Sequence, residues 1–430
     1  MLRKILGTVG TRYLIAFLNL FLIFINAKIL GKEGLGLVGL IYASANIAVM
    51  FNSVLCGNTI VYFMNRYPLG YVFWPAAGWS FVGSAIACGI MFFLGMIPEG
   101  YGWLVYGLAV LMTLVGVNSR VFLGEDRIAA FNLTMAVQGG GLFVFLLFFY
   151  FVAGAKEVSS YVNALFLTNG TALLLSILLL ASSFSHKSRK AGYPEPDSFG
   201  KILKEMFVYG LWSSMESLAE GLTTRLNYFM VERFSGLGGV GLLDSGTKVS
   251  ESAWNISRGV SLIEYSSIAK TKDAEEQRRI TLQLFKLTYC VLFLVMGIIL
   301  LVPEWIYTKY LFSAEFKGIR EIILLLSVGI VAFGGNNILA HYFIGCGKIK
   351  YCAACSFLGL GTLLLIGCFL IPAKGIPGAA LTSSIAYICM LLFSLLVFMR
   401  QTRTAARELL PTPGDWEALR SRLFHKHSKH

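Results

Sequence analysis

The sequence predicts an all-α polytopic membrane protein with about twelve transmembrane helices, arranged as two six-helix bundles around a central cavity. Of its 430 residues, 56% are hydrophobic and only 14% are charged, and the mean hydropathy is +0.70. A soluble domain of this size could not bury so much apolar surface. Long apolar runs also recur along the whole chain, and most of the polar residues inside them fall in four runs.

The apolar runs define the predicted transmembrane spans in chain order. Each is about long enough to cross the hydrocarbon core as a helix. The predicted spans are 7–30, 36–63, 71–97, 102–123, 130–152, 159–184, 206–232, 240–266, 281–302, 322–342, 351–371 and 375–399.

The longest interruption lies between the sixth and seventh spans. It is basic, contains Pro194 and Pro196, and has six spans on each side. We therefore expect two bundles that are joined by a loop. The predicted units are an N-terminal bundle over 1–185, a basic cytoplasmic linker over 186–205, a C-terminal bundle over 206–399 and a basic cytoplasmic tail over 400–430.

Basic residues are distributed unequally between the two sides of the predicted membrane. With the N-terminus inside, twenty-three Lys and Arg residues fall in cytoplasmic segments and eight on the opposite side. Cytoplasmic loops are enriched in these residues, so both termini are predicted to be cytoplasmic. The same bias accounts for the net charge of +13 without a nucleic-acid partner.

The two halves contain a weak internal repeat. The segment LGKEGLGLVGL follows the first span, and SGLGGVGLLDS lies between the seventh and eighth spans. An offset of 205 residues aligns Gly36 with Gly241 and also aligns Gly31 with Gly236. With six helices per half, such a repeat predicts two halves related by an axis along the membrane normal.

A polar stripe in the eighth span is the strongest sign of function. Its residues follow one another at spacings of four, three, four and three, so on one continuous helix they fall within an arc of about 80°. The stripe is roughly 21 Å long and should face a protein interior or a water-filled cavity. An alternative interpretation is a set of salt bridges between two helices. The residues are Asp244, Lys248, Glu251, Asn255 and Arg258.

The other polar spans are the first, second and seventh, so the polar helices hold matching positions in the two halves. This arrangement predicts a cavity between the halves. Guanidinium groups match phosphate oxygens well, and amides suit sugar hydroxyls. The further polar residues of interest are Arg12, Asn19, Asn46, Glu216, Glu220, Arg225 and Asn227.

The twelve spans, the turn LGKEGLGLVGL with its echo, and the polar pairs of spans together resemble a known family. They are similar to the polysaccharide flippases (O-antigen, Wzx-type) of the multidrug/oligosaccharidyl-lipid/polysaccharide exporter superfamily. The stretch Asn227–Lys270 resembles the seventh and eighth helices of that family. The resemblance implies a MATE/MurJ-like fold. It also implies a flippase that moves an undecaprenyl-diphosphate-linked oligosaccharide, an O-antigen or capsule/exopolysaccharide repeat unit, to the outer leaflet of the bacterial inner membrane.

Residue roles follow from the chemistry together with this resemblance. Arg12 and Arg258 have an alternative role as interfacial residues near a membrane surface, and the acids have an alternative role as partners of the cavity cations. The predicted headgroup contacts are Arg12, Arg225, Lys248 and Arg258, and the predicted sugar contacts are Asn19, Asn46, Asn227 and Asn255. The predicted ion-coupling residues are Glu216, Glu220, Asp244 and Glu251.

The expected partners are the lipid-linked oligosaccharide, membrane lipids and glycan polymerase or assembly proteins. We expect no metal and no cofactor, with energy from a proton or sodium gradient or the membrane potential. Cys352 and Cys355 form a CxxC without the further ligands of a zinc site.

Two rival functions belong to the same superfamily, namely a peptidoglycan-precursor flippase and a multidrug exporter. A third rival is a membrane-embedded glycan polymerase or transferase, which would need catalytic groups in a sizeable aqueous loop. The longest outer loop, about 303–321, contains no histidine and no acidic cluster. We therefore predict that the protein is not an enzyme.

Overall fold

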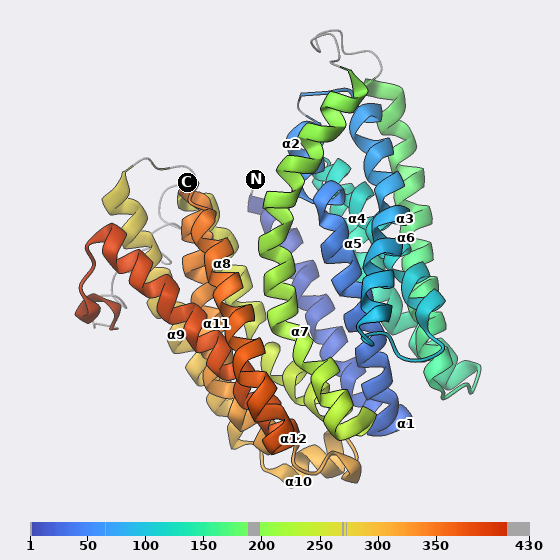
Figure 1. Ribbon diagram of the computed structural model, residues 1–430, viewed down its shortest axis with the longest axis vertical. Coiled ribbons are helices and arrows are strands. Elements are labelled where there is room, and N and C mark those ends of the chain that lie inside the picture. The colour runs from blue at the N-terminus through green and yellow to red at the C-terminus, as the bar shows by residue number, and fades with distance from the viewer. Residues whose placement is uncertain (1, 65, 188–197, 269–270, 272, 411–430) are drawn as a thin grey trace.

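The computed structural model describes residues 2–64, 66–187, 198–268, 271 and 273–410. Side chains at 2–16, 182–187, 212, 213, 256, 262, 263 and 265–267 are outside the description. In Figure 1, α1–α6 form one group of helices and α8, α9, α11 and α12 form another, with α7 running between them. The two groups lie close together at the end near α10 and spread apart towards the end that holds the N-terminus.

The described chain is built from helices. In the first half they are α1 (Leu2–Cys56), α2 (Asn58–Phe63), α3 (Leu69–Phe93), α4 (Gly102–Gly124), α5 (Ile128–Leu147), the π-helical turn η1 (Phe148–Val152) and α6 (Val158–Lys187). In the second half they are α7 (Phe199–Glu251), α8 (Trp254–Ile268), α9 (Ala274–Leu301), α10 (Glu304–Ile306), η2 (Tyr307–Leu311), η3 (Ala314–Phe316), α11 (Ile319–Gly345), α12 (Lys350–Thr402) and η4 (Ala406–Leu409).

Three of these helices are each bent at one glycine. α1 and α12 thereby supply two membrane-crossing segments each, and the second segment of α7 makes one crossing together with α8. The glycines are Gly31 in α1, Gly236 in α7 and Gly375 in α12, with φ angles of 68°, 68° and 61°. An L-residue rarely adopts such angles, whereas glycine does so readily. Among the described residues, eight helices are long and apolar enough to cross a membrane, α1 and α12 among them. The more polar α7 and α8 complete the two predicted six-helix bundles.

Two details of the predicted spans are wrong. The second span does not continue to residue 63, because α1 ends at Cys56 and the separate short helix α2 follows. The eighth span is not one helix, because α7 ends at Glu251 and α8 begins at Trp254. The hydroxyl of Ser252 donates to the carbonyl of Val249 at 2.6 Å at this break. Serine side chains that bond to the preceding turn compete with regular helix hydrogen bonds.

The internal repeat predicted from the sequence is visible in the backbone. Gly31 and Gly236 have ψ angles of −176° and −177° in addition to equal φ angles. A Cβ atom on Gly36 would lie 1.9 Å from the carbonyl oxygen of Leu237, and one on Gly241 would lie 1.8 Å from that of Lys32. The two contacts are related by the same offset of 205 residues, so α1 and α7 cross in a reciprocal manner.

The second segment of α1 then packs along the first segment of α7. A Cβ on Gly210 would lie 1.7 Å from the carbonyl oxygen of Val54, and one on Gly221 would lie 1.9 Å from the sulfur of Met50. Small residues let membrane helices approach closely, and van der Waals packing rather than transfer from water stabilises such contacts. This seam joins the two bundles over much of the length of the helices.

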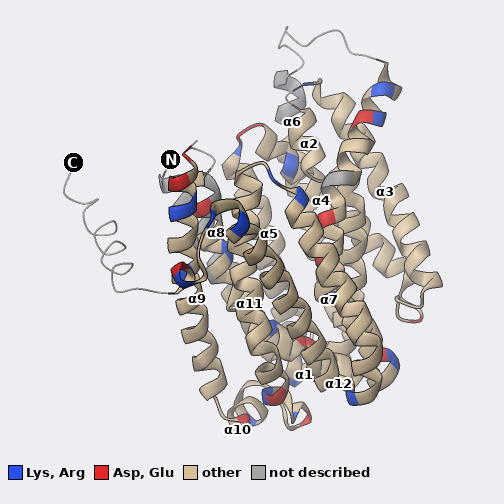
Figure 2. Cartoon of the chain, turned by 60° about the vertical axis from the view of Figure 1, so that its left-hand side comes forward, with Lys and Arg blue, Asp and Glu red and all other residues tan. Residues whose placement is uncertain are grey.

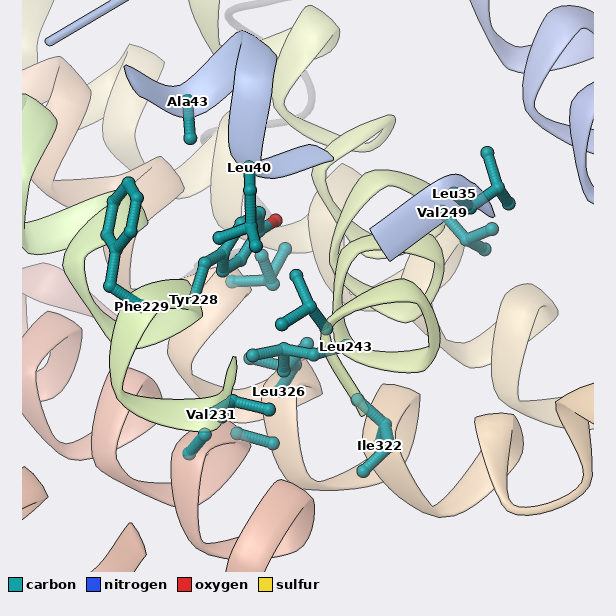
Figure 3. Close-up of a cluster of buried hydrophobic side chains, with 14 of the residues drawn as sticks. Leu35, Leu40, Ala43, Tyr228, Phe229, Val231, Leu243, Val249, Ile322 and Leu326 are labelled. Atoms are coloured by element: carbon teal, nitrogen blue, oxygen red, sulfur yellow. The ribbon is translucent and has the colours of Figure 1, made fainter. Parts of the chain in front are cut away.

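A buried apolar cluster surrounds the crossing. Figure 3 shows side chains from α1, α7 and α11 gathered around Leu243, among them Leu40, Tyr228 and Leu326. Leu40 and Leu243 are completely buried. The bends of α1 and α7 are thus held in a packed core, and the segments beyond the bends diverge from it.

The loop between α9 and α11 closes the end of the molecule near the bends. Its Glu315 carboxylate accepts a hydrogen bond from the backbone N–H of Lys32 at 3.1 Å. Because Gly31 interrupts α1, this N–H begins a new helical segment, where a carboxylate is favoured. Phe312 also packs edge-on against Phe24 of α1, with ring centroids 5.2 Å apart. These contacts connect the second half to the first half at this end.

The reciprocal glycine crossing can be tested by adding one methyl group. Gly36→Ala should destabilise the protein by about 1–3 kcal/mol, because overpacking forces the two backbones apart. Thermal unfolding in detergent measures the effect. Gly116→Ala is the matched control, because no atom lies within 4 Å of its Cβ position. Equal melting temperatures for the two variants would contradict the crossing.

The Glu315 contact should hold this end closed. Glu315→Ala should increase the reaction of a cysteine placed at the buried position of Leu35 with a membrane-impermeant thiol reagent, in a background without native cysteines. Glu33→Ala, a nearby exposed carboxylate, is the control and should leave the rate unchanged. An unaltered rate in Glu315→Ala would show that the carboxylate does not contribute to closure.

Candidate functional site

A cavity of about 260 Å³ lies where α1, α7 and α8 face one another. Its wall contains residues from both segments of α1, from the end of α7 and from the start of α8, together with one residue each from α5 and α6. The lining residues are Asn19, Leu20, Leu22, Ile23, Asn26, Leu35, Tyr42, Leu142, Tyr161, Lys248, Glu251, Ser252, Asn255 and Arg258.

Charged residues are unusual at this depth in the molecule. Figure 2 shows most Lys, Arg, Asp and Glu residues near the two ends of the helices, with a largely uncharged middle. Charges within a bilayer face protein or water-filled cavities because lipid offers no partners. The cavity lining contains three charged residues, Lys248, Glu251 and Arg258.

The polar stripe keeps its orientation although the helix breaks within it. Four of its five residues, Lys248, Glu251, Asn255 and Arg258, line the cavity. The fifth, Asp244, is buried at the crossing, where its Cγ would lie 3.3 Å from a Cβ on Gly39 of α1. The polar residues before and after the break at Ser252 and Ala253 therefore line the same cavity.

The strongest ion pair of the site joins the two segments of α7. Arg225 donates to Glu251 through both terminal nitrogens, and each N–O distance is 2.7 Å. The side chains are 26% and 14% exposed, so the pair is largely shielded from solvent. Arg225 also lies over the ring of Tyr228 at 5.5 Å. Arg225 does not reach the cavity lining itself but holds Glu251, which does.

A second ion pair lies one turn earlier. Lys248 Nζ is 2.7 Å from Asp244 Oδ2, with exposed side-chain fractions of 28% and 3%. The ammonium group has three donors and this contact uses one. Lys248 therefore stays available to an anion in the cavity while Asp244 neutralises part of its charge.

Arg258 is the cation of the cavity that is least engaged. Its side chain is exposed, and its guanidinium lies 5.8 Å from the ring centroid of Trp254. Within the described part of the chain, no carboxylate lies within ion-pair distance of it. A planar guanidinium in this position can bind phosphate oxygens in a bidentate manner.

The predicted sugar contacts divide into two groups. Asn19 and Asn255 line the cavity, and the amide of Asn255 donates to the carbonyl of Ser252 at 3.0 Å. Asn46 instead donates to the carbonyl of Tyr42 and is absent from the lining. Asn227 is buried and donates to the Ser383 hydroxyl on α12 at 2.8 Å, so it joins helices. The side chain of Arg12 lies outside the described residues.

Glu216 and Glu220 lie on the first segment of α7 and not in the cavity lining. The two acids stand four residues apart, so they lie on the same side of the helix. Arg258 of the cavity lining interacts electrostatically with Glu220. The pair is therefore within electrostatic reach of the most exposed cation of the cavity.

The sequence analysis missed two residues of interest. Tyr161 lies in α6, which was treated as an apolar span, yet it lines the cavity. Glu264 lies in α8 outside the polar stripe and is completely buried. The described residues contain no group of three or more His, Cys, Asp or Glu side chains that could hold a metal ion.

No protein-family model matches the chain, and a comparison with curated proteins finds no match. Solved structures do match. The chain aligns with an inward-facing multidrug resistance MATE family transporter of the MOP superfamily at a TM-score of 0.68 and 15% identity, covering 92% of this chain and 94% of that one. For the lipid II flippase MurJ in an inward closed conformation, the TM-score is 0.72 at 10% identity, with 94% and 88% covered.

An outward-facing MATE transporter of the same superfamily gives a TM-score of 0.60 at 16% identity, with 93% of each chain covered. The chain therefore has the MATE/MurJ-like fold of two six-helix bundles around a central cavity. Its backbone is closer to the inward-facing and inward closed structures than to the outward-facing one. This agrees with bundles that meet near the bends and spread apart at the other end.

The Arg225–Glu251 pair should stabilise the bend of α7. Glu251→Gln removes a charge-assisted interaction and should lower the free energy of unfolding by about 1.5–3 kcal/mol. Thermal unfolding in detergent measures the loss. The double variant Arg225→Leu/Glu251→Leu should recover much of it, because it leaves no unpaired charge. Arg233→Gln, at an exposed position of the same helix, is the control; a loss of equal size there would contradict the assignment.

Proposed function

We propose that the protein is a flippase for an undecaprenyl-diphosphate-linked oligosaccharide, an O-antigen or capsule/exopolysaccharide repeat unit. It would move this molecule from the cytoplasmic to the outer leaflet of the bacterial inner membrane by alternating access. The observation that carries the proposal is a cavity whose wall presents Lys248 and Arg258 beside three amide side chains, those of Asn19, Asn26 and Asn255. The MATE/MurJ-like fold supports transport, and one structure with this fold is named a lipid II flippase.

The two cations suit the diphosphate. Arg258 offers a planar set of donors, and Lys248 retains donors beyond its contact with Asp244. Asn19 and Asn255 lie on the same lining and suit the hydroxyls of the adjoining sugar. A volume of about 260 Å³ lies just below the range of about 300–1,000 Å³ that is usual for small-ligand sites. We infer that the diphosphate occupies the cavity and that the sugars extend beyond it, past these amides.

The lipid tail has a natural route in this arrangement. Asn19 of α1 and Asn255 of α8 come from different halves of the molecule and line the same cavity. We infer that the tail passes between α1 and α8 into the bilayer while the diphosphate stays on the polar wall. Movement of the two bundles about the crossing of α1 and α7 would then expose the headgroup to the other side.

The remaining predicted residues take supporting roles. Arg225 positions Glu251 instead of contacting the headgroup, and Asp244 positions Lys248. A bound diphosphate would compete with Asp244 for Lys248. The pair Glu216 and Glu220 stays our candidate for ion coupling through a proton or sodium gradient, with the membrane potential as a further source of energy. Asn227 and Asn46 are left out of the proposed binding surface.

Peptidoglycan-precursor transport is the second candidate, because its cargo carries the same diphosphate and the MurJ structure shares the fold. Multidrug export is favoured by an acidic, aromatic cavity, whereas here both acids of the stripe, Glu251 in the cavity wall and Asp244 at the crossing, are paired with cations. A membrane-embedded glycan polymerase or transferase would need catalytic groups in a sizeable aqueous loop, and the outer loop at about 303–321 contains no histidine and no acidic cluster. We propose both termini on the cytoplasmic side; Figure 1 places the starts of α1 and α7 at the same end, as an even number of crossings per bundle requires.

The cavity cations can be tested on purified protein. Arg258→Gln and Lys248→Gln should each weaken binding of undecaprenyl-diphosphate-linked glycan by about 10–100-fold, corresponding to the loss of one charge-assisted interaction of about 1.5–3 kcal/mol. Native mass spectrometry or a binding titration in detergent measures this. Lys374→Gln, at an exposed site, is the control. Wild-type affinity in both cavity variants would refute the proposed headgroup site.

The cargo itself is identified by deleting the gene in its host. Lipid-linked repeat units should accumulate on the cytoplasmic side and the surface polysaccharide should be lost. Accumulated peptidoglycan precursor would favour the second candidate. Unchanged surface glycan together with increased drug sensitivity would replace the proposal with drug export.

A further inference from the structure

Glu264 on α8 is a buried acid that the cavity does not use. Its exposed fraction is 0%, and neither carboxyl oxygen has a hydrogen-bond partner among the described residues. It packs where α8 meets α9 and α11. Thr281 of α9 lies beside it, but its hydroxyl donates to the carbonyl of Gln277 at 2.9 Å. Cys346, from the turn after α11, is within electrostatic reach of it.

No positive charge compensates this carboxyl group within the described part of the chain. On α9, Arg278 is bound to Glu275 and to Glu408 of η4. After α11, Lys348 donates to the side chain of Gln401 at 2.7 Å. On α11, His341 bonds to the carbonyl of Asn337. An ionised carboxylate without a partner in such surroundings would cost several kcal/mol, so the neutral form is favoured.

The ligand of this site is a proton rather than a metal ion. Hard metal cations bind several oxygen ligands at once, and calcium binds six to eight. Here the neighbouring hydroxyl of Thr281 is already used by the carbonyl of Gln277, and the described residues contain no group of three or more His, Cys, Asp or Glu side chains that could hold a metal ion. A single buried carboxyl group without a cation beside it is neutral only when it is protonated.

The position of Glu264 on α8 connects this proton to the cavity wall. Asn255 lines the cavity and stands nine residues earlier, which at about 100° per residue places Glu264 on the opposite side of the helix. α8 ends at Ile268, about 6 Å farther along the axis. Release of the proton would favour movement of Glu264 towards the solvent at this end, and Asn255 and Arg258 would move with the helix.

We propose that Glu264 is a proton-binding site that couples protonation to the position of α8, and through α8 to the shape of the cavity. The site itself is independent of the cargo. Its use as the energy-coupling step of transport rests on the proposed function. Thermodynamic linkage then requires that protonation of Glu264 changes the affinity for the headgroup, and that headgroup binding changes the proton affinity of Glu264 by the same factor.

Infrared spectroscopy of the full-length protein in nanodiscs tests the site without any cargo. A protonated carboxylic acid has a C=O stretching band that a carboxylate lacks. Glu264→Gln should remove one component of that band. The control Glu33→Gln should remove none, and Glu216→Gln/Glu220→Gln should remove a separate component. Should Glu264→Gln not fold, Glu264→Met serves as a second neutral variant. An unchanged band in both neutral variants would overturn the proposal, as would stabilisation of the wild type by sodium that Glu264→Gln abolishes.

A second measurement tests the coupling. Double electron–electron resonance between spin labels on α1 and α8 should show a distance distribution that changes with pH in the wild type. In Glu264→Gln the distribution should stay at its low-pH form, and Glu33→Gln should behave as the wild type. The same pH response in Glu264→Gln would overturn the coupling. This measurement uses no substrate, so its result can be interpreted even if the proposed cargo is wrong.

Discussion

The contact between Gly36 and Gly241 sets the geometry on which the remaining structure depends. Each glycine lies against a backbone carbonyl of the other helix at a distance that leaves no room for a Cβ. The contact brings together two helices that have just bent, at Gly31 and Gly236, with matching backbone angles. Both segments of each helix therefore start from one fixed point, and the cavity opens where these segments diverge. A larger residue at the crossing would shift both walls of the cavity at once.

The two ion pairs of the site depend on this arrangement. The crossing buries Asp244 against Gly39, so a lysine one turn later can be neutralised and still face the cavity. The bend at Gly236 folds α7 back on itself, which brings Arg225 to Glu251 across 26 positions of sequence. In both ion pairs, the opposite charges stabilise each other inside the bilayer, where lipid does not solvate them. An anionic headgroup would meet one cation that already has a carboxylate partner, Lys248, and one that has none among the described residues, Arg258, so its binding would exchange the partner of Lys248 alone.

Much of the fold could be predicted because the membrane-crossing segments and the connections between them depend on short stretches of sequence, through their hydropathy and their glycines. The lengths of the apolar runs predicted the crossing segments, and the offset of 205 residues predicted that the connection after the first span is repeated between the seventh and eighth spans. The break at Ser252 was missed because a serine bonded to the preceding turn leaves the hydrophobic pattern unchanged. The site was predicted less completely. Helical spacing placed Lys248, Asn255 and Arg258 on one face, but it could not indicate that Asn227 faces Ser383 or that Arg225 meets Glu251, since both depend on how separate segments pack.

The two halves share a backbone repeat but differ in chemistry. All three charged residues of the cavity lining, Lys248, Glu251 and Arg258, come from α7 and α8, whereas the first half contributes amides and tyrosines such as Asn19 and Tyr42. If the proposed headgroup binds here, this asymmetry would orient it, with its phosphates towards the charged residues of the second half. The buried acid Glu264 lies in this same half, behind the helix that carries Arg258. A change of its protonation would act first on the wall that holds the charge of the cargo, and the amide wall of the first half would respond through the shared crossing.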